Sequence, residues 1–183
     1  MRKKIFLVCG RSCVGKSSIV KKVCSDLGLR QVRSYTTRPM RQGEEEESDH
    51  IFITDDDIKL YADDIAAYTK INGYHYFTTR KVLRDSDFYV VDPNGIEFLK
   101  EGCWDEFKFV VIYVRASRLI TELRAQCRGD ADVFIKRCVS EQSQFDLFES
   151  IEDWDYCIWN TGTFYSAVEE MKNIVLGEGV VSY

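Results

Sequence analysis

The segment that most constrains this chain is its first glycine-bounded turn. The apolar run 5–9 leads directly into the octapeptide Gly10-Arg11-Ser12-Cys13-Val14-Gly15-Lys16-Ser17, which fits G-x-x-x-x-G-K-[ST] at every fixed position. Glycine permits the dihedral angles with which backbone N–H groups surround a phosphate, and a helix N-terminus adds partial positive charge. In this motif Lys16 reaches the β- and γ-phosphates of a nucleotide, and the hydroxyl of Ser17 binds Mg²⁺.

The surroundings of the motif favour a phosphate site over a chance match. An apolar strand precedes it, and apolar side chains with helical spacing follow in residues 18–23. The helix is predicted to run from Lys16 to Leu27 and to end at Gly28. The alternative is a strand–turn–helix unit that binds no phosphate.

Composition indicates a single globular domain. The 183 residues suffice for one hydrophobic core, and no apolar run is long enough to span a bilayer. The first strand follows the N-terminus too soon for a signal peptide, so we expect a cytoplasmic protein. The net charge of −5 argues against non-specific nucleic-acid binding but allows a nucleotide pocket. The seven cysteines form no C-x-x-C motif, so we expect them to be reduced thiols. Because there are only two histidines and the cysteine spacings match no common zinc motif, no structural metal is expected.

A second polar segment has the composition of an anion-binding loop. It reads Ser34-Tyr35-Thr36-Thr37-Arg38-Pro39-Met40-Arg41-Gln42-Gly43-Glu44. Proline stiffens the backbone, and the guanidinium groups of Arg38 and Arg41 can each hold a phosphate with two hydrogen bonds. A solvated turn with two surface arginines is the alternative. The acidic run 44–47 that follows is interpreted as a solvated loop.

The middle of the chain predicts a small β-rich lobe. A strand is expected at 51–53, and the run Asp55-Asp56-Asp57 is interpreted as a helix start rather than a metal site. Residues 66–79 alternate aromatic and polar side chains around Asn72-Gly73, which predicts a hairpin. This lobe would be inserted between the first two strands of the main sheet.

The remaining strands alternate with helices, which is typical of a parallel α/β sheet. Apolar strands are expected at 88–92, 109–114 and 154–160, and a closing helix at 164–176. Asp92 ends the first of these strands, where ligands of such sheets bind. Two helices joined near Gly129-Asp130 carry three arginines suited to a mobile lid over phosphates: Arg124, Arg128 and Arg137. The sequence thus predicts a three-layer P-loop sheet with an inserted lobe and a helical lid.

With these motifs together, the chain resembles the guanylate kinase family over nearly its whole length, most specifically in residues 34–44. The resemblance implies one domain, 1–183, in three parts. A core that binds ATP would comprise 1–32, 82–117 and 141–183. A lobe that binds the nucleoside monophosphate would span 33–81, and a lid 118–140.

The resemblance also implies roles for individual residues. Lys16, Arg38, Arg124 and Arg137 would be catalytic, and Ser17 would bind Mg²⁺. ATP would be held by Gly10, Arg11, Ser12, Cys13, Val14, Gly15, Lys16, Ser17, Ser18, Arg128 and Asn160. The monophosphate would be held by Ser34, Arg38, Arg41, His50, Tyr76, Thr78 and Asp92.

Three positions depart from the family pattern. His50 replaces a tyrosine on the acceptor phosphate, and Val90 replaces the first acid of a D-x-D motif that ends at Asp92. The glutamate that reads guanine falls on Ala67, with Asp63, Asp64 or Asp92 as possible substitutes. Ala67→Glu is therefore expected to shift acceptor preference toward GMP.

The function implied is that of an ATP-dependent nucleoside monophosphate kinase that converts GMP or dGMP to the diphosphate with Mg²⁺. The alternatives are a kinase for another nucleoside monophosphate and a non-catalytic binding module of the same fold. A GTPase is disfavoured because N-K-x-D and a switch-like D-x-x-G do not occur in the expected context. The partners would be ATP and the monophosphate, without nucleic acid or membrane, and the chain would act as a monomer or a homodimer.

Overall fold

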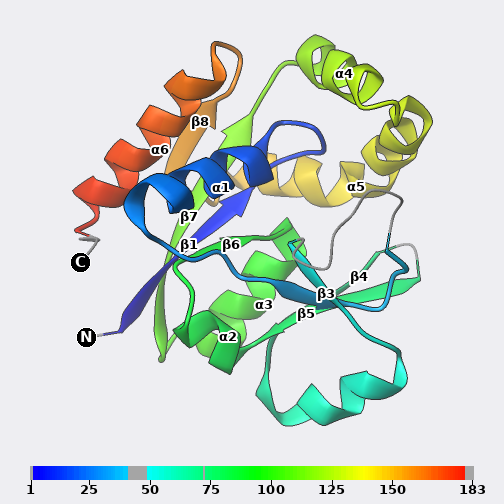
Figure 1. Cartoon of the computed structure of the whole chain (residues 1–183), viewed down its shortest axis with the longest axis vertical. Coiled ribbons are helices and arrows are strands. Elements are labelled where there is room, and N and C mark those ends of the chain that lie inside the picture. Colours follow the sequence, from blue (N-terminus) through cyan, green and yellow to red (C-terminus); the bar gives the residue numbers. More distant parts are fainter. Residues whose placement is uncertain (1, 41–48, 72, 180–183) are drawn as a thin grey trace.

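The computed structural model describes residues 2–40, 49–71 and 73–179, and has two sheets with helices around them (Figure 1). The larger sheet is parallel, with strand order β6-β1-β7-β8. Its strands are β1 (Lys3–Cys9), β6 (Phe88–Val90), β7 (Phe107–Arg115) and β8 (Tyr156–Trp159). The α/β class and the parallel sheet predicted from the alternation of strands and helices are confirmed.

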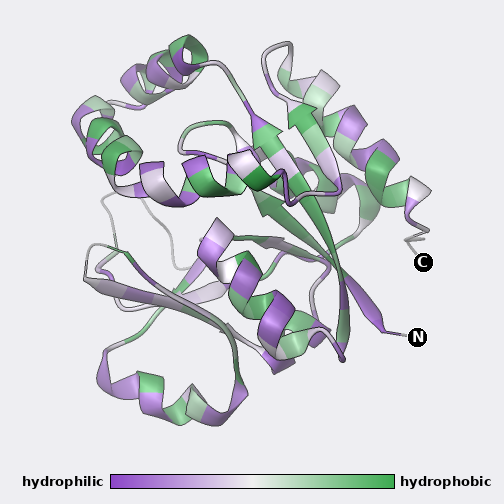
Figure 2. Cartoon of the chain, turned by 180° about the vertical axis from the view of Figure 1, so that it is seen from behind, coloured by the Kyte–Doolittle hydropathy of each residue, from purple (hydrophilic) through white to green (hydrophobic). Residues whose placement is uncertain are grey.

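Alternate side chains of β1 enter two different cores. Ile5 and Leu7 pack with helices α3 (Pro93–Cys103) and α5 (Ala131–Ile151) on one face of the sheet. Phe6 and Val8 pack with α1 (Lys16–Leu27) and α6 (Phe164–Gly177) on the other face. Because both faces are covered, the central positions of β1 and β7 are apolar, as the green strands in Figure 2 show.

The smaller sheet lies at one end of the larger one, next to α3 (Figure 1). Its order is β3-β2-β5-β4, and only β2 and β3 run parallel. Its strands are β2 (Ser34–Thr36), β3 (His50–Phe52), β4 (Ile65–Ile71) and β5 (Tyr74–Thr79). The predicted hairpin is present, with Ile71 opposite Tyr74, although Asn72 lies outside the described residues. A 3₁₀ helix (Asp56–Asp64) joins β3 to β4, and the short α2 (Arg80–Arg84) follows β5.

The lid helices are α4 (Arg118–Cys127) and α5, with the break between them at Arg128 to Asp130. The lid boundary expected after residue 140 falls inside α5, which continues without interruption to Ile151. All seven cysteines are free thiols. No helix in the described parts of the chain has the length and apolar character needed to cross a membrane.

Candidate functional site

The turn between β1 and α1 has a backbone that only glycine fits at its two ends. Gly10 has φ of +152°, and a Cβ atom there would lie 2.2 Å from the carbonyl oxygen of Val114. Gly15 has φ of +100°, and a Cβ atom would lie 2.5 Å from Nδ2 of Asn160. Such distances are too short for a Cβ atom, so the glycines are needed for close packing as well as for their dihedral angles.

Two residues expected to contact the nucleotide, Arg124 and Asn160, form hydrogen bonds that hold this turn. Arg124 donates from Nη1 to the carbonyl oxygen of Val14 (3.0 Å) and from Nη2 to that of Asn160 (3.1 Å). The side chain of Asn160 donates to the same Val14 oxygen at 2.8 Å and is only 2% exposed. Burial lowers the pKa of Arg124. Neither residue lines the cavity described next, so both act as supports of the turn in this structure.

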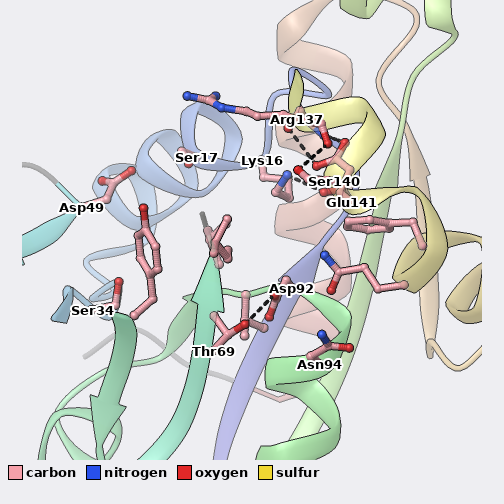
Figure 3. A pocket seen from close by; sticks show the side chains of 18 of the residues that line it. Lys16, Ser17, Ser34, Asp49, Thr69, Asp92, Asn94, Arg137, Ser140 and Glu141 are labelled. Carbon is pink, nitrogen blue, oxygen red and sulfur yellow. Dashed lines mark hydrogen bonds between the residues drawn. The ribbon is translucent and has the colours of Figure 1, made fainter. Parts of the chain in front are cut away.

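A cavity of about 900 Å³ lies where the turn, the smaller sheet and α5 meet (Figure 3). The predicted site residues that line it are Gly10, Ser12, Lys16, Ser17, Ser34, Arg38, His50, Tyr76, Asp92, Arg128 and Arg137. The fold therefore brings most of the predicted site to one place. Arg41 lies outside the described residues.

Lys16 is the cation of the turn that faces this cavity. Its Nζ atom donates to the carbonyl oxygens of Gly10 (2.5 Å) and Arg11 (3.0 Å). Burial lowers the pKa of Lys16, against the opposing influence of Cys9 and Glu141. The ammonium group is thus positioned by the turn that is predicted to bind phosphate.

The smaller sheet contributes a second group of polar side chains. Oγ of Ser34 and Nδ1 of His50 are 2.8 Å apart across the β2–β3 pair. Arg38 is 7% exposed, and its guanidinium group lies 5.1 Å from the centre of the Phe52 ring. Ser34 lies across the cavity from Arg137 and Glu141 (Figure 3). The cavity can therefore hold an anion near Arg38 as well as one at the turn.

A third part of the cavity contains a buried carboxylate. Asp92 caps α3 by accepting a hydrogen bond from the Gly95 N–H group (2.9 Å), and it accepts another from the Thr69 hydroxyl (3.3 Å). Burial raises the pKa of Asp92. Of the three aspartates considered as guanine readers, only Asp92 lines the cavity. The Asp64 carboxylate instead accepts a hydrogen bond from the Lys81 backbone.

Two expected acceptor-side positions lie away from the cavity. Thr78 is 0% exposed, and its Oγ1 atom has no hydrogen-bond partner among the described residues. Ala67, its cross-strand neighbour, is 1% exposed and packs in the apolar core with Leu99 and Cys103. The position matched to the family's guanine-reading glutamate is therefore a core position in this chain.

The lid contributes Arg128 and Arg137, both of which line the cavity. Neither forms an ion pair with any residue that the structure describes. Their positive charges are available to an anion in the cavity.

Several lining residues were not identified from the sequence. They are Lys21, Asp49, Thr69, Lys70, Ile71, Tyr89, Val91, Asn94, Ser140, Glu141, Ser143, Gln144 and Phe145. Val90, noted above as a departure from the family pattern, also lines the cavity. Thr69 could have been found, because it pairs with Tyr76 across the hairpin and cross-strand partners share a face. The residues of α5 carry no comparable signal.

The oxygen atoms that line the cavity suit a metal ion that is bound mainly by the phosphates of a nucleotide. No three His, Cys, Asp or Glu side chains cluster to hold a metal anywhere in the described ranges. Mg²⁺ commonly takes one or two protein oxygens and completes its shell with phosphates and water. The Ser17 hydroxyl, which lines the cavity, matches that requirement.

Comparisons with known proteins match almost the whole chain to one family. The family model for guanylate kinase matches residues 2–178. The guanylate kinase of Syntrophotalea carbinolica is 27% identical over 96% of this chain and 86% of its own. That of Thermotoga maritima is 29% identical over 97% and 88%, respectively. The crystal structure of guanylate kinase from Anaplasma phagocytophilum shares the fold, with a TM-score of 0.64 at 21% identity over 97% of this chain and 86% of that one.

Proposed function

Because the chain belongs to the guanylate kinase family, we propose that it transfers the γ-phosphoryl group of ATP to GMP or dGMP, giving ADP and the nucleoside diphosphate. One observation carries this proposal: the phosphate-binding turn, the polar group around Arg38 and the lid arginines all line a single cavity. Two phosphorylated substrates need such a cavity, with separate cations for each.

In this proposal the turn and Lys16 bind the β- and γ-phosphates of ATP, while Arg38, Ser34 and His50 bind the phosphate of GMP. Arg41 is proposed to assist there. A phosphate oxygen of GMP attacks the γ-phosphorus in line, and the bond from that phosphorus to the β–γ bridging oxygen breaks. The protein positions the two phosphates and stabilises charge, so no side chain needs to act as a nucleophile.

Two further groups of residues complete the proposed mechanism. Arg128 and Arg137 neutralise the charge that spreads over the transferred phosphoryl group. Mg²⁺, held by the nucleotide phosphates and the Ser17 hydroxyl, would supply additional positive charge there. The lobe 33–81 is proposed to bind the acceptor, and the lid 118–140 to cover both substrates.

Guanine recognition is proposed to rest on Asp92. Guanine presents adjacent N1–H and N2–H₂ donors, and a carboxylate is the natural acceptor for such a pair. Asp49, also in the cavity, forms an ion pair with Lys21 (2.9 Å), and Glu141 accepts hydrogen bonds from Ser12. Asp92 also accepts hydrogen bonds, one from Gly95 and one from Thr69, but it forms no ion pair with any described residue and does not bind the phosphate-binding turn. We therefore assign the base to Asp92.

The test is an ADP-release assay with Mg·ATP and a panel of ribo- and deoxynucleoside monophosphates. GMP or dGMP is expected to be the best acceptor. Lys16→Ala should lower turnover at least about 100-fold, the scale of losing one electrostatic stabiliser of a transition state, while the variant stays folded. A wild-type protein that binds GMP but releases no ADP with any acceptor would support the binding module instead.

A further inference from the structure

The phosphate-binding turn already binds an anionic side chain of its own chain. Oε1 of Glu141 accepts a hydrogen bond from the backbone N–H of Ser12, and Oε2 accepts one from the Ser12 hydroxyl, each at 2.9 Å. Backbone N–H groups of this turn are the donors that a nucleotide phosphate uses. Because an N–H group has a single hydrogen, the carboxylate and a phosphate compete for it.

Glu141 also interacts electrostatically with Lys16, the cation of the turn. Its negative charge opposes the lowering of the Lys16 pKa that burial causes. Figure 3 shows Glu141 beside Lys16, on the side of the cavity that also contains Ser140 and Arg137. A carboxylate and a polyphosphate held around one ammonium group repel each other, and a partly enclosed cavity strengthens that repulsion.

Helix α5 is anchored so that Glu141 stays against the turn. Arg11 donates from Nε to Glu149 (2.9 Å) and from Nη2 to Asp146 (2.7 Å). Glu149 also accepts a hydrogen bond from the Tyr113 hydroxyl in the core. Two consecutive residues of the turn, Arg11 and Ser12, are therefore bound by acidic side chains of one helix.

We propose that Glu141 gates the ATP site, with its carboxylate occupying the Ser12 donors until the phosphates of ATP displace it. The inference rests on the proposed function in one respect, the assignment of the turn to ATP. The competition weakens ATP binding and couples it to a movement of the Glu141 side chain or of α5. The loss of affinity that Glu141 causes should increase with the number of phosphates on the nucleotide.

The test compares wild type with Glu141→Gln, which keeps the side-chain size and removes the charge. Calorimetry with Mg²⁺ and a non-hydrolysable ATP analogue should show about tenfold tighter binding for the variant, the effect of one hydrogen bond to a charged group. The gain should be smaller for ADP and absent for adenosine. Asp132→Asn is the matched control, because it removes a charge from an exposed position on the same helix. It should leave all three affinities unchanged.

Several outcomes would overturn the gate. An unchanged or weaker affinity for the ATP analogue in a folded Glu141→Gln protein would do so, as would an equal gain for adenosine. Glu141→Ala provides a second variant, expected to show the same order of gains, and thermal denaturation checks that both variants fold. Wild type that binds no ATP analogue would instead refute the assignment of the turn to ATP, which separates the two failures.

Discussion

The hydroxyl of Thr69 donates a hydrogen bond of 3.3 Å to the carboxylate of Asp92. This contact joins β4 of the smaller sheet to the residue that caps α3, just beyond the end of β6. It fixes the carboxylate at the boundary between the two sheets. The orientation of the smaller sheet and the proposed base-reading group are thereby linked.

Asp92→Asn should lower kcat/KM for GMP by about 10- to 100-fold, the loss of a charged acceptor worth about 1.5–3 kcal/mol. In wild type, kcat/KM for GMP should fall as pH drops through the raised pKa of Asp92, because the protonated group accepts poorly. The variant should lack this component of the pH profile. A variant with the wild-type profile would contradict the assignment of Asp92 to guanine.

The same substitution should leave the fold stable. Asparagine caps helices well, so the bond from the Gly95 N–H group can persist. Since the folded-state pKa of Asp92 is raised, its ionisation costs stability as pH rises from the unfolded pKa, about 3.9, through the folded value. At neutral pH, Asp92→Asn should therefore melt at the same temperature as wild type or higher. Differential scanning fluorimetry across pH checks this.

Ala67→Glu should destabilise the protein rather than improve its use of GMP, contrary to the expectation from the sequence. Residue 67 lies in the apolar core, and an unpaired buried carboxylate costs about 3–5 kcal/mol. The free energy of unfolding in urea measures this loss. Leu60→Glu, at a position in the same lobe that is 78% exposed, should change it little. Equal stability of the two variants would argue against the core placement.

Gly15→Ala should weaken ATP binding, because the new side chain clashes with a residue that supports the turn in addition to straining the backbone. The new Cβ atom would meet Nδ2 of Asn160, which holds the Val14 carbonyl group. Gly28→Ala is the control, since Gly28 also has positive φ (+67°) but nothing lies within 4 Å of its Cβ position. Both should lose about 1–2 kcal/mol of stability from the left-handed conformation. Only Gly15→Ala should raise the Kd for ATP, by at least about tenfold on the scale of one lost charge-assisted bond.

Arg124→Ala and Arg137→Ala should separate a structural arginine from a catalytic one. Arg124→Ala leaves the carbonyl oxygen of Asn160 without its guanidinium donor and the Val14 oxygen with only the Asn160 amide, so the free energy of unfolding should fall by about 1–3 kcal/mol. Its melting temperature should drop by roughly 2–4 °C per kcal/mol. Arg137→Ala should melt like wild type but lose kcat at least about tenfold, as expected for one cation at the transferring group. Identical melting losses would refute this division.

The sequence was most informative where function depends on local geometry. The turn from Gly10 to Ser17, helix α1 and the hairpin follow from short-range patterns, and the structure contains all of them. The sequence was less informative where packing between distant segments determines which residues a side chain contacts. Arg124 and Arg137 both carry suitable charges, but only the structure shows that Arg124 donates to the carbonyl oxygens of the turn while Arg137 lines the cavity. Likewise, the packing of α3 against β4 and the irregular register between Ile65 and Ala67 place Ala67 in the core.

Helix α5 has a mechanical consequence for the lid. Its C-terminal half supplies Phe145 and Phe148 to the core, while its N-terminal half carries Arg137. Eight residues at 1.5 Å each separate Arg137 from Phe145, a lever arm of roughly 12 Å. A tilt of about 20° around the phenylalanines would move the guanidinium group by ~4 Å, because an uninterrupted helix turns as one body. A movement of the arginine through such a tilt therefore requires the two phenylalanines to repack in the core.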